Sequence, residues 1–488
     1  MMRFSPDFAL GVGAILKAQA TIARLLSVSL LMSHSVLADG VSDRRSNPNF
    51  EGTRQAVRES IMGITGRAPY ASNDRVEGLV ELPASQIIRN VYTMEQMGLN
   101  SAQLPIYPWS DDYWAIYKGV LGARYADPSF PGSADWSANA GYVKAKDNDV
   151  ASIVKSGNTR DINLLSPSEK YDLLVGDSEG TLTRTMWSEG QGYFQASGKV
   201  ETWMGICHGW AVASYMLPRP QRSIVMTAAD GKTQITFYPS DIKALASLLW
   251  AKAPHNTRFV SGRCNTKDPS RTAVSGNALG RTDDQVCFDT NPGTWHMTAV
   301  NRIGVEKRSF VMDVTYDYEV WNQPVYSYSV KYFNPETGTV KANAREATIA
   351  YSAYKSDPYK AFRKNSAMTK IVGVEMDVTY VVETQPRHQS LDSPAYDQHR
   401  SVKYRYDLEL DDSGQILGGE WYTSLHPDFL WTAASNVKIQ SVGDYSLANA
   451  PWDPRKPVPA IYKIAAKRAS ALGQPLSTVL DGLIQLSK

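Results

Sequence analysis

The spacing of apolar residues in the first third of the chain predicts a helix. Ile87, Ile88, Val91, Met94 and Met97 recur at helical intervals, and Gly98 follows the last of them. Further on, Ser166 precedes Pro167, and Glu169 follows three residues after the serine. This arrangement is that of a capping box with proline in the first turn, so a second helix is expected to begin there.

Alternation of apolar and polar residues predicts antiparallel strands over most of the remaining chain. Residues 223–237 predict a hairpin with its turn at Asp230 and Gly231, and residues 239–250 predict a capped amphipathic helix. Strands are expected over residues 309–317, 320–333, 370–383, 402–410 and 416–421, and two short helices are expected in 451–488. Regular alternation of apolar and polar residues indicates sheets with one face packed on the core and the other exposed to solvent.

One segment contains a candidate nucleophile. Cys207 follows Gly205 and opens a run of small and apolar residues that can be helical. At a helix N-terminus the free backbone N–H groups and the helix dipole favour a thiolate, and the amide of the cysteine can donate to an oxyanion. The alternative is a buried thiol that acts as a small apolar side chain.

Two later residues complete a candidate triad. A turn at residues 291–295 is expected to place His296 at the start of a strand. The next strand contains Asp313, 17 residues after the histidine. Cys, His and Asp in this order, with the last two on adjacent strands, are the layout of papain-like and transglutaminase-like thiol enzymes. Asp317 shares a strand face with Asp313, and Asp317 or Asn322 is the alternative to Asp313 as the group that orients the imidazole.

Several blocks of sequence resemble one known family. They include Gly-Ile-Cys-His-Gly-Trp around Cys207, Asn-Pro-Gly-Thr-Trp-His ending at His296, Phe-Val-Met-Asp-Val-Thr around Asp313, and Val-Trp-Asn-Gln-Pro-Val at 320–325. Gly-Gly-Glu-Trp at 418–421 and His-Pro-Asp-Phe-Leu-Trp at 426–431 are similar as well. Together, from about residue 105 to 431, these blocks resemble the secreted transglutaminase elicitor family of plant-pathogenic oomycetes and marine bacteria.

The resemblance implies a fold and an activity. We predict an α+β fold with a papain-like cysteine-enzyme core, in which the helix that bears the nucleophile packs on an antiparallel sheet, with helical N-terminal and mixed C-terminal additions. The implied activity is that of a protein-glutamine γ-glutamyltransferase, acting outside the cell on protein glutamine and lysine side chains and dependent on calcium. In oomycete relatives the Val-Trp-Asn-Gln-Pro-Val segment begins a peptide that plants recognise. Here Tyr-Ser-Tyr-Ser follows it in place of the family's Arg-Gly-Phe-Lys.

The second donor of an oxyanion hole is not identified by the pattern. Papain-like enzymes commonly place a glutamine six residues before the cysteine, but this chain has Glu201 there. Gln191 and Gln195 are the remaining candidates upstream of Cys207.

The N-terminus and the charge bear on where the protein acts. Lys17 and Arg24 precede an apolar run at 25–32, and Val36-Leu-Ala38 offers a cleavage site, so residues 1–38 are expected to be a signal peptide of a secreted protein. An uncleaved membrane anchor is the alternative, although stable membrane insertion is not expected. Cleavage would lower the net charge from +2 to about zero, and no basic block remains to bind nucleic acid.

Three cysteines are present in the chain. In an exported protein Cys264 and Cys287 are expected to form a disulfide, which leaves Cys207 as the reactive thiol. No spacing typical of a zinc site occurs. Asp411 and Asp412 are possible calcium ligands, but aspartates are also common in hairpin turns.

We predict four regions and keep three functional hypotheses. The regions are a signal peptide (1–38), a leader or pro-segment with a helical N-terminal region (39–160), a catalytic core (161–365) and a C-terminal β-rich region ending in helices (366–488). The hypotheses are a transglutaminase, a secreted papain-like peptidase or amidase, and a non-catalytic surface-binding protein. The triad alone does not separate acyl transfer from hydrolysis, because both begin with the same thioester.

Overall fold

The structure, a computed structural model, describes residues 74–146, 149–263, 290–315, 318–363, 365–423, 426–447 and 450–488. The predicted signal peptide, Cys264, Cys287 and Asp317 lie outside these residues. All described residues belong to one compact unit, Glu59–Lys488.

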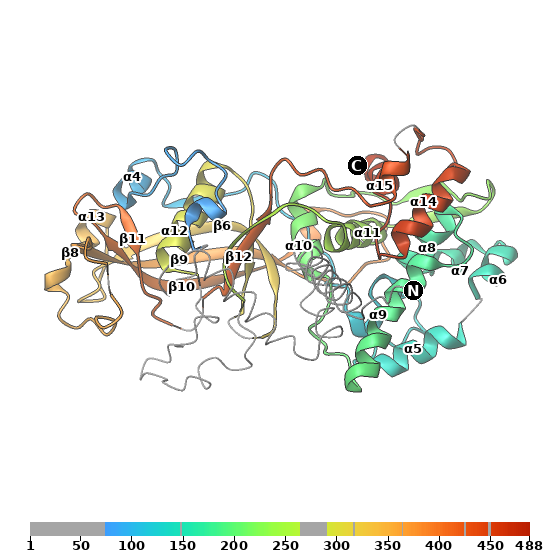
Figure 1. The fold of residues 1–488 in the computed structure, drawn as a ribbon, viewed down its shortest axis with the longest axis horizontal. Helices are drawn as coiled ribbons and strands as arrows, with labels where there is room; N and C mark the ends of the chain where they lie inside the picture. The colour runs from blue at the N-terminus through green and yellow to red at the C-terminus, as the bar shows by residue number, and fades with distance from the viewer. Residues whose placement is uncertain are drawn as a thin grey trace, which may run out of the picture. The chain divides into compact units, whose positions relative to one another are not determined.

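A ten-stranded sheet forms one part of this unit (Figure 1). Its main path runs β11–β10–β9–β6–β5–β12–β4, β1 and β7 pair with β6, and β8 pairs with β9. Every pairing in it is antiparallel. The strands are β1 (Ser101–Gln103), β4 (Thr257–Ser261), β5 (Val311–Asp313), β6 (Asn322–Phe333), β7 (Val340–Lys341), β8 (Ile349–Ala350), β9 (Lys370–Val382), β10 (Gln398–Leu410), β11 (Ile416–Gly418) and β12 (Phe429–Ala433).

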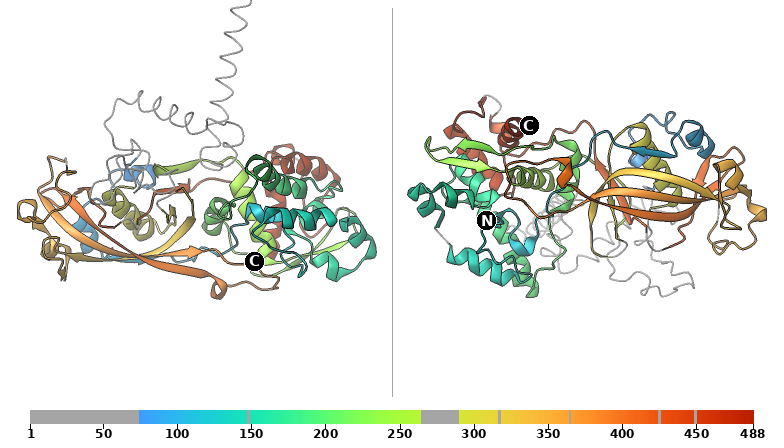
Figure 2. Two further views of the ribbon diagram at one scale, coloured as in Figure 1. Left: turned by 90° about the horizontal axis from the view of Figure 1, so that it is seen from below. Right: turned by 180° about the vertical axis from the view of Figure 1, so that it is seen from behind.

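Helices form the other part of the unit and also cover the sheet (Figures 1 and 2). They are α4 (Val91–Gln96), α5 (Trp136–Ala145), α6 (Asp149–Ser156), α7 (Thr159–Asn163), α8 (Pro167–Val175), α9 (Thr181–Ser197), α10 (Cys207–Met216), α11 (Pro239–Lys252), α12 (Pro292–Ala299), α13 (Ala344–Ala347), α14 (Ala460–Ser470) and α15 (Ser477–Ser487). A separate hairpin consists of β2 (Ile224–Thr227) and β3 (Gln234–Phe237). The predicted α+β class is confirmed, and α10 packs against β6 as expected for a helix that bears a nucleophile.

Local sequence signals account for many of these elements. Ser166 and Glu169 form the predicted capping box at the start of α8. Strands are present where alternation predicted them at 370–383 and 402–410, although β10 begins earlier, at Gln398, and pairs with β9 along its whole length. The predicted helix near residue 87 is shorter than expected, because α4 begins only at Val91, where Asn90 caps it. The C-terminal helices are also present as predicted.

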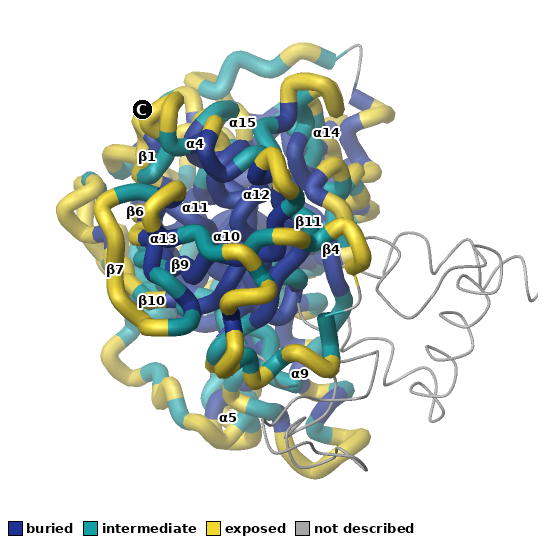
Figure 3. Tube along the Cα trace, turned by 90° about the vertical axis from the view of Figure 1, so that its left-hand side faces the viewer, coloured by how far each residue is buried: buried dark blue, intermediate teal, exposed yellow. Residues whose placement is uncertain are grey.

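The main sheet curls so that strands distant in its order face each other. Tyr404 on β10 and Met312 on β5 are separated by β9 and β6 in the sheet, yet the Tyr404 hydroxyl lies 3.8 Å from the Met312 sulfur. The sheet also joins β6 to β9, so the boundary predicted between residues 365 and 366 falls inside one sheet. The buried residues fill the interior between the sheet and the helices (Figure 3).

Two buried ion clusters connect elements of the fold that are distant in the sequence. Lys170 of α8 and Asp241 of α11 lie 2.6 Å apart, and neither side chain is exposed. The second, the Arg363 cluster, contains one guanidinium that contacts three carboxylates, those of Asp357, Asp407 and Glu409. Buried charges of this kind are costly when either partner is removed, because the remaining charge has no water to solvate it.

Candidate functional site

Cys207 is the first residue of α10, as the sequence predicted. Close backbone approaches place it there: a Cβ at Gly205 would lie 2.4 Å from the Tyr113 carbonyl, and the Ile206 N–H donates to the same carbonyl at 2.7 Å. Two residues after the cysteine, Gly209 allows α10 to approach α11, since a Cβ there would lie 2.1 Å from the Ser247 carbonyl oxygen. Glycine is therefore required on both sides of Cys207 by packing rather than by backbone conformation.

The sulfur of Cys207 contacts the strand that begins at Asn322. The thiol donates to the Val320 carbonyl at 3.7 Å, and the Asn322 side-chain amide donates to the sulfur at 3.5 Å. Cys207 is buried, and burial raises the pKa of its thiol to about 11, while the hydrogen bond from Asn322 acts in the opposite direction. In this state the group is a thiol at neutral pH, and a base must take its proton before it can attack.

Asp313 lies on the neighbouring strand, directly opposite Asn322 in the β5–β6 register. Residues opposite each other in an antiparallel pair project from the same face, so Asp313 and Asn322 share the face that Cys207 contacts. Asp313 Oδ1 accepts hydrogen bonds from the Trp321 N–H and the Thr315 hydroxyl, whereas Oδ2 has no hydrogen-bond partner among the described residues. Burial raises the pKa of this carboxyl to about 7, and its charge acts on the Cys207 thiol.

Glu383 is a second carboxyl at the site, and sequence analysis did not identify it. It follows β9 and accepts a hydrogen bond from the Gln323 side chain at 2.7 Å. Burial raises its pKa to about 7, and its charge also acts on Cys207. The signal in the sequence that could have indicated Glu383 was Gln323, which lies in the Val-Trp-Asn-Gln-Pro-Val motif. A buried polar side chain at this position needs a hydrogen-bond partner.

His296 occupies a different environment from the one predicted. The expectation of a strand at this residue is wrong: Asn291 caps a helix with Pro292 in its first turn, and His296 lies within that helix, α12. Its Nδ1 pairs with the Tyr406 hydroxyl at 2.8 Å, and its Nε2 has no hydrogen-bond partner among the described residues. The predicted hydrogen bond from His296 to Asp313 is therefore not formed.

The protonation of His296 follows from its burial. The side chain is fully buried, and burial lowers the pKa of the imidazole to about 3. A general base works best when its pKa is near the working pH, so the imidazole in this environment is a weak base. The structure thus brings Cys207 and Asp313 together around Asn322 and places His296 beside Tyr406.

The other candidates from the sequence lie elsewhere. Gln191 and Gln195 are exposed on α9, whereas Cys207 is buried, and Asp411 accepts backbone hydrogen bonds within the turn between β10 and β11. Within the described ranges, no three or more His, Cys, Asp or Glu side chains are grouped to hold a metal ion.

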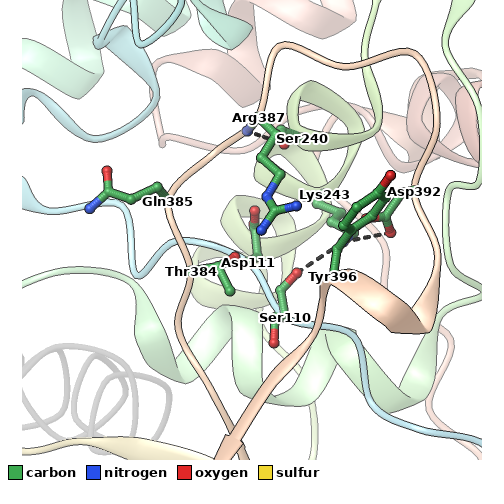
Figure 4. A pocket seen from close by; sticks show the side chains of 9 residues that line it. All are labelled: Ser110, Asp111, Ser240, Lys243, Thr384, Gln385, Arg387, Asp392 and Tyr396. Atoms are coloured by element: carbon green, nitrogen blue, oxygen red, sulfur yellow. Dashed lines mark hydrogen bonds and ion pairs between the residues drawn. The ribbon is translucent and has the colours of Figure 1, made fainter.

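A small polar pocket lies near the start of α11 (Figure 4). Both of its basic side chains are already engaged. Lys243 donates to the Ser110 carbonyl at 2.9 Å and pairs with Asp392 at 2.8 Å, and the Arg387 guanidinium lies over the Tyr396 ring, 4.7 Å from its centroid. Cys207 is not part of the lining, which consists of Ser110, Asp111, Ser240, Lys243, Thr384, Gln385, Arg387, Asp392 and Tyr396. This pocket is thus separate from the thiol site.

No helix in the described part of the chain has the length and apolar character needed to cross a membrane. Comparison with curated proteins finds no matching relative. Among solved structures, the chain is similar to the crystal structure of the GP42 transglutaminase from Phytophthora sojae, with a TM-score of 0.46 and 20% sequence identity over 80% of this chain and 94% of that chain.

The sequence also matches the model of the transglutaminase elicitor family over residues 84–451, which include Cys207, His296, Asp313 and the whole main sheet. The match covers well over half of the chain, and the chain belongs to the transglutaminase elicitor family.

Proposed function

We propose that this protein is a secreted transglutaminase that uses Cys207 as its nucleophile. The observation that carries the proposal is the placement of Cys207 at the start of α10, with its sulfur against the family motif at 320–325 and with Asp313 on the adjoining strand. Family membership supports acyl transfer as the chemistry.

The reaction proceeds through a thioester. The Cys207 sulfur attacks the carboxamide carbon of a glutamine side chain, the carbon–nitrogen bond breaks, and ammonia leaves after it receives a proton. A lysine amine then attacks the thioester carbon, an isopeptide bond forms, and the sulfur recovers a proton. Water in place of the amine would convert the glutamine side chain to that of glutamate instead.

Proton transfer from Cys207 needs a nearby base. Asp313 and Glu383 both act electrostatically on the thiol, and each has a pKa of about 7, so each changes protonation state near neutral pH. The sequence-based assignment of His296 as base and Asp313 as its orienter remains part of the proposal and is tested separately. His296→Gln should abolish amine transfer if the imidazole is the base. Tyr406→Phe serves as the control that removes the hydroxyl partner of His296 and leaves the imidazole in place.

The decisive experiment is incorporation of a primary-amine probe into a glutamine-rich acceptor protein. We expect incorporation by the wild-type protein and none by Cys207→Ala with its fold intact. Release of new N-termini without amine incorporation would favour the peptidase or amidase. A folded wild-type protein with neither activity would leave the surface-binding hypothesis.

Two further parts of the proposal have simple tests. The assay with and without a chelator measures the calcium dependence that the resemblance implies. N-terminal sequencing of protein from the culture medium should begin near Asp39, and a chain that starts at Met1 and stays with the cells would contradict secretion with cleavage after Ala38.

A further inference from the structure

The side chain of Asn322 lies between Cys207 and Trp431. Its Nδ2 donates to the Cys207 sulfur at 3.5 Å, and its Oδ1 accepts from the Trp431 indole N–H at 2.7 Å. All three residues are buried, with 4% exposure for Asn322, 5% for Cys207 and 4% for Trp431. Water therefore does not compete for these contacts.

The orientation of the amide follows from chemistry. The nitrogen and oxygen of a carboxamide are similar in size, so the direction of the group is decided by its hydrogen-bond partners. The Trp431 indole nitrogen can only donate, which requires the Asn322 oxygen to face it. The amide N–H of Asn322 must then face the sulfur of Cys207.

The sheet holds this arrangement in register. Asn322 is opposite Asp313 in the β5–β6 pair, and Trp431 is opposite Val311 in the β12–β5 pair. Because β5 lies between β12 and β6, the Trp431 indole on β12 reaches across β5 to Asn322 on β6. Because three paired strands fix the two backbones, the amide has one stable orientation relative to the start of α10.

We propose that Asn322 is a catalytic residue whose amide N–H stabilises the negative sulfur of Cys207, and that Trp431 is the positioning residue that fixes this amide. The proposal rests on the proposed role of Cys207 as nucleophile. A neutral donor suits this position, since the carboxyls of Asp313 and Glu383 already act on the thiol and disfavour its ionisation.

The proposal predicts the rate at which iodoacetamide alkylates Cys207. Asn322→Asp keeps an oxygen for the Trp431 N–H but replaces the donor to the sulfur with an acceptor. We expect alkylation at pH 8 to slow at least about tenfold, because hydrogen bonds to a charged group are among the stronger ones, and the midpoint of the pH profile to move upward. Trp431→Phe leaves Asn322 in place but frees its amide to turn, so we expect slowing in the same direction by a smaller factor.

A matched control separates this effect from the general cost of a buried carboxyl. Asn301 is a buried asparagine whose amide contacts the Ile88 and Met297 carbonyls, and Asn301→Asp should leave the alkylation rate of the folded protein unchanged. Circular dichroism and the unfolding midpoint show which variants are folded. If Asn322→Asp does not fold, the alkylation rate of Trp431→Phe tests the role of the Asn322 amide.

The outcomes distinguish this inference from the proposed function. Alkylation at the wild-type rate in a folded Asn322→Asp or Trp431→Phe variant would overturn the role of Asn322, whatever the wild-type protein catalyses. Slower alkylation in these variants combined with no amine incorporation by the wild-type protein would support the hydrogen-bonded sulfur and contradict the transglutaminase. Slower alkylation with a matching loss of amine incorporation supports both.

Discussion

Gly209→Ala should destabilise the protein, although alanine is normally the better helix residue. In the interior of a helix, alanine is favoured over glycine by about 1 kcal/mol. At Gly209, however, the new Cβ would lie 2.1 Å from the Ser247 carbonyl oxygen and 2.7 Å from both the Cβ and the backbone nitrogen of Ala251. Relief of these contacts requires α10 and α11 to separate by more than about 1 Å, since ordinary contacts are about 3.5–4 Å.

The atoms that would have to move are two backbone atoms and an alanine Cβ of α11, a helix that is itself fixed. Asp241 holds the first turn of this helix to Lys170, and Lys243 holds it to the Ser110 carbonyl. A side-chain rotation therefore cannot relieve the clash. Overpacking of this kind costs about 1–3 kcal/mol, which exceeds the gain in helix propensity.

The matched control is Gly141→Ala in α5. An added Cβ at Gly141 meets no atom within 4 Å, so only the helix propensity changes, and this variant should gain about 0.5–1 kcal/mol. Denaturant unfolding followed by circular dichroism measures both, with the midpoint of Gly209→Ala below that of the wild type and the midpoint of Gly141→Ala above it. An unfolding midpoint for Gly209→Ala equal to or above the wild-type value would refute the reasoning.

The same variant tests the link between packing and chemistry. Gly209 is two residues from Cys207, so a shift of about 1 Å there displaces the sulfur from Asn322, and misplacement of this size can lower a rate by about a hundredfold. Amine incorporation by folded Gly209→Ala should fall accordingly, while Gly141→Ala keeps the wild-type rate. Equal rates in the two variants would show that the position of α10 is not critical to the reaction.

Three other perturbations have expected results. Alkylation of Cys207 by iodoacetamide should rise about tenfold per pH unit from pH 7 to 10, since its thiol pKa is about 11; a plateau above pH 7 would instead indicate a preformed thiolate–imidazolium pair. Arg363→Met should lower the free energy of unfolding by about 3–5 kcal/mol, because it leaves the buried carboxylates of the Arg363 cluster without their cation; a loss below about 1 kcal/mol in denaturant unfolding would contradict this. Burial raises the pKa of Asp111 to about 7, so this group contributes stability below pH 4 that is lost as the pH rises through 7. Asp111→Asn should remove a slope of at most about 1.4 kcal/mol per pH unit between pH 4 and 7, and an unchanged slope in urea unfolding would count against it.

Local sequence signals determined the elements whose ends or turns are specified by residues next to them in the chain. The capping box at Ser166 and Glu169, the hairpin turn at Asp230 and Gly231, and the alternation in β9 and β10 all specify structure through neighbouring residues. The placement of Cys207 at a helix start is of the same kind. Each could be predicted because the interactions that decide it lie within a few residues.

The helix at His296 could not be predicted from apolar periodicity for a physical reason. All eight residues of α12 are buried, so the helix has no exposed face and its sequence shows no helical alternation of apolar and polar positions. Asn291 and Pro292 were the remaining signal, since asparagine before proline is a common helix start as well as a turn.

The partners of Cys207 were decided by the tertiary structure alone. Asn322 is 115 residues away along the chain, and its contact with Trp431 spans another 109. Strand register and the curl of the sheet bring these residues together, and neither is encoded by any short segment, because both depend on which strands pair. The sequence alone therefore determined the family, the fold class and the candidate nucleophile, while packing decided which buried groups surround its sulfur and how readily it loses a proton.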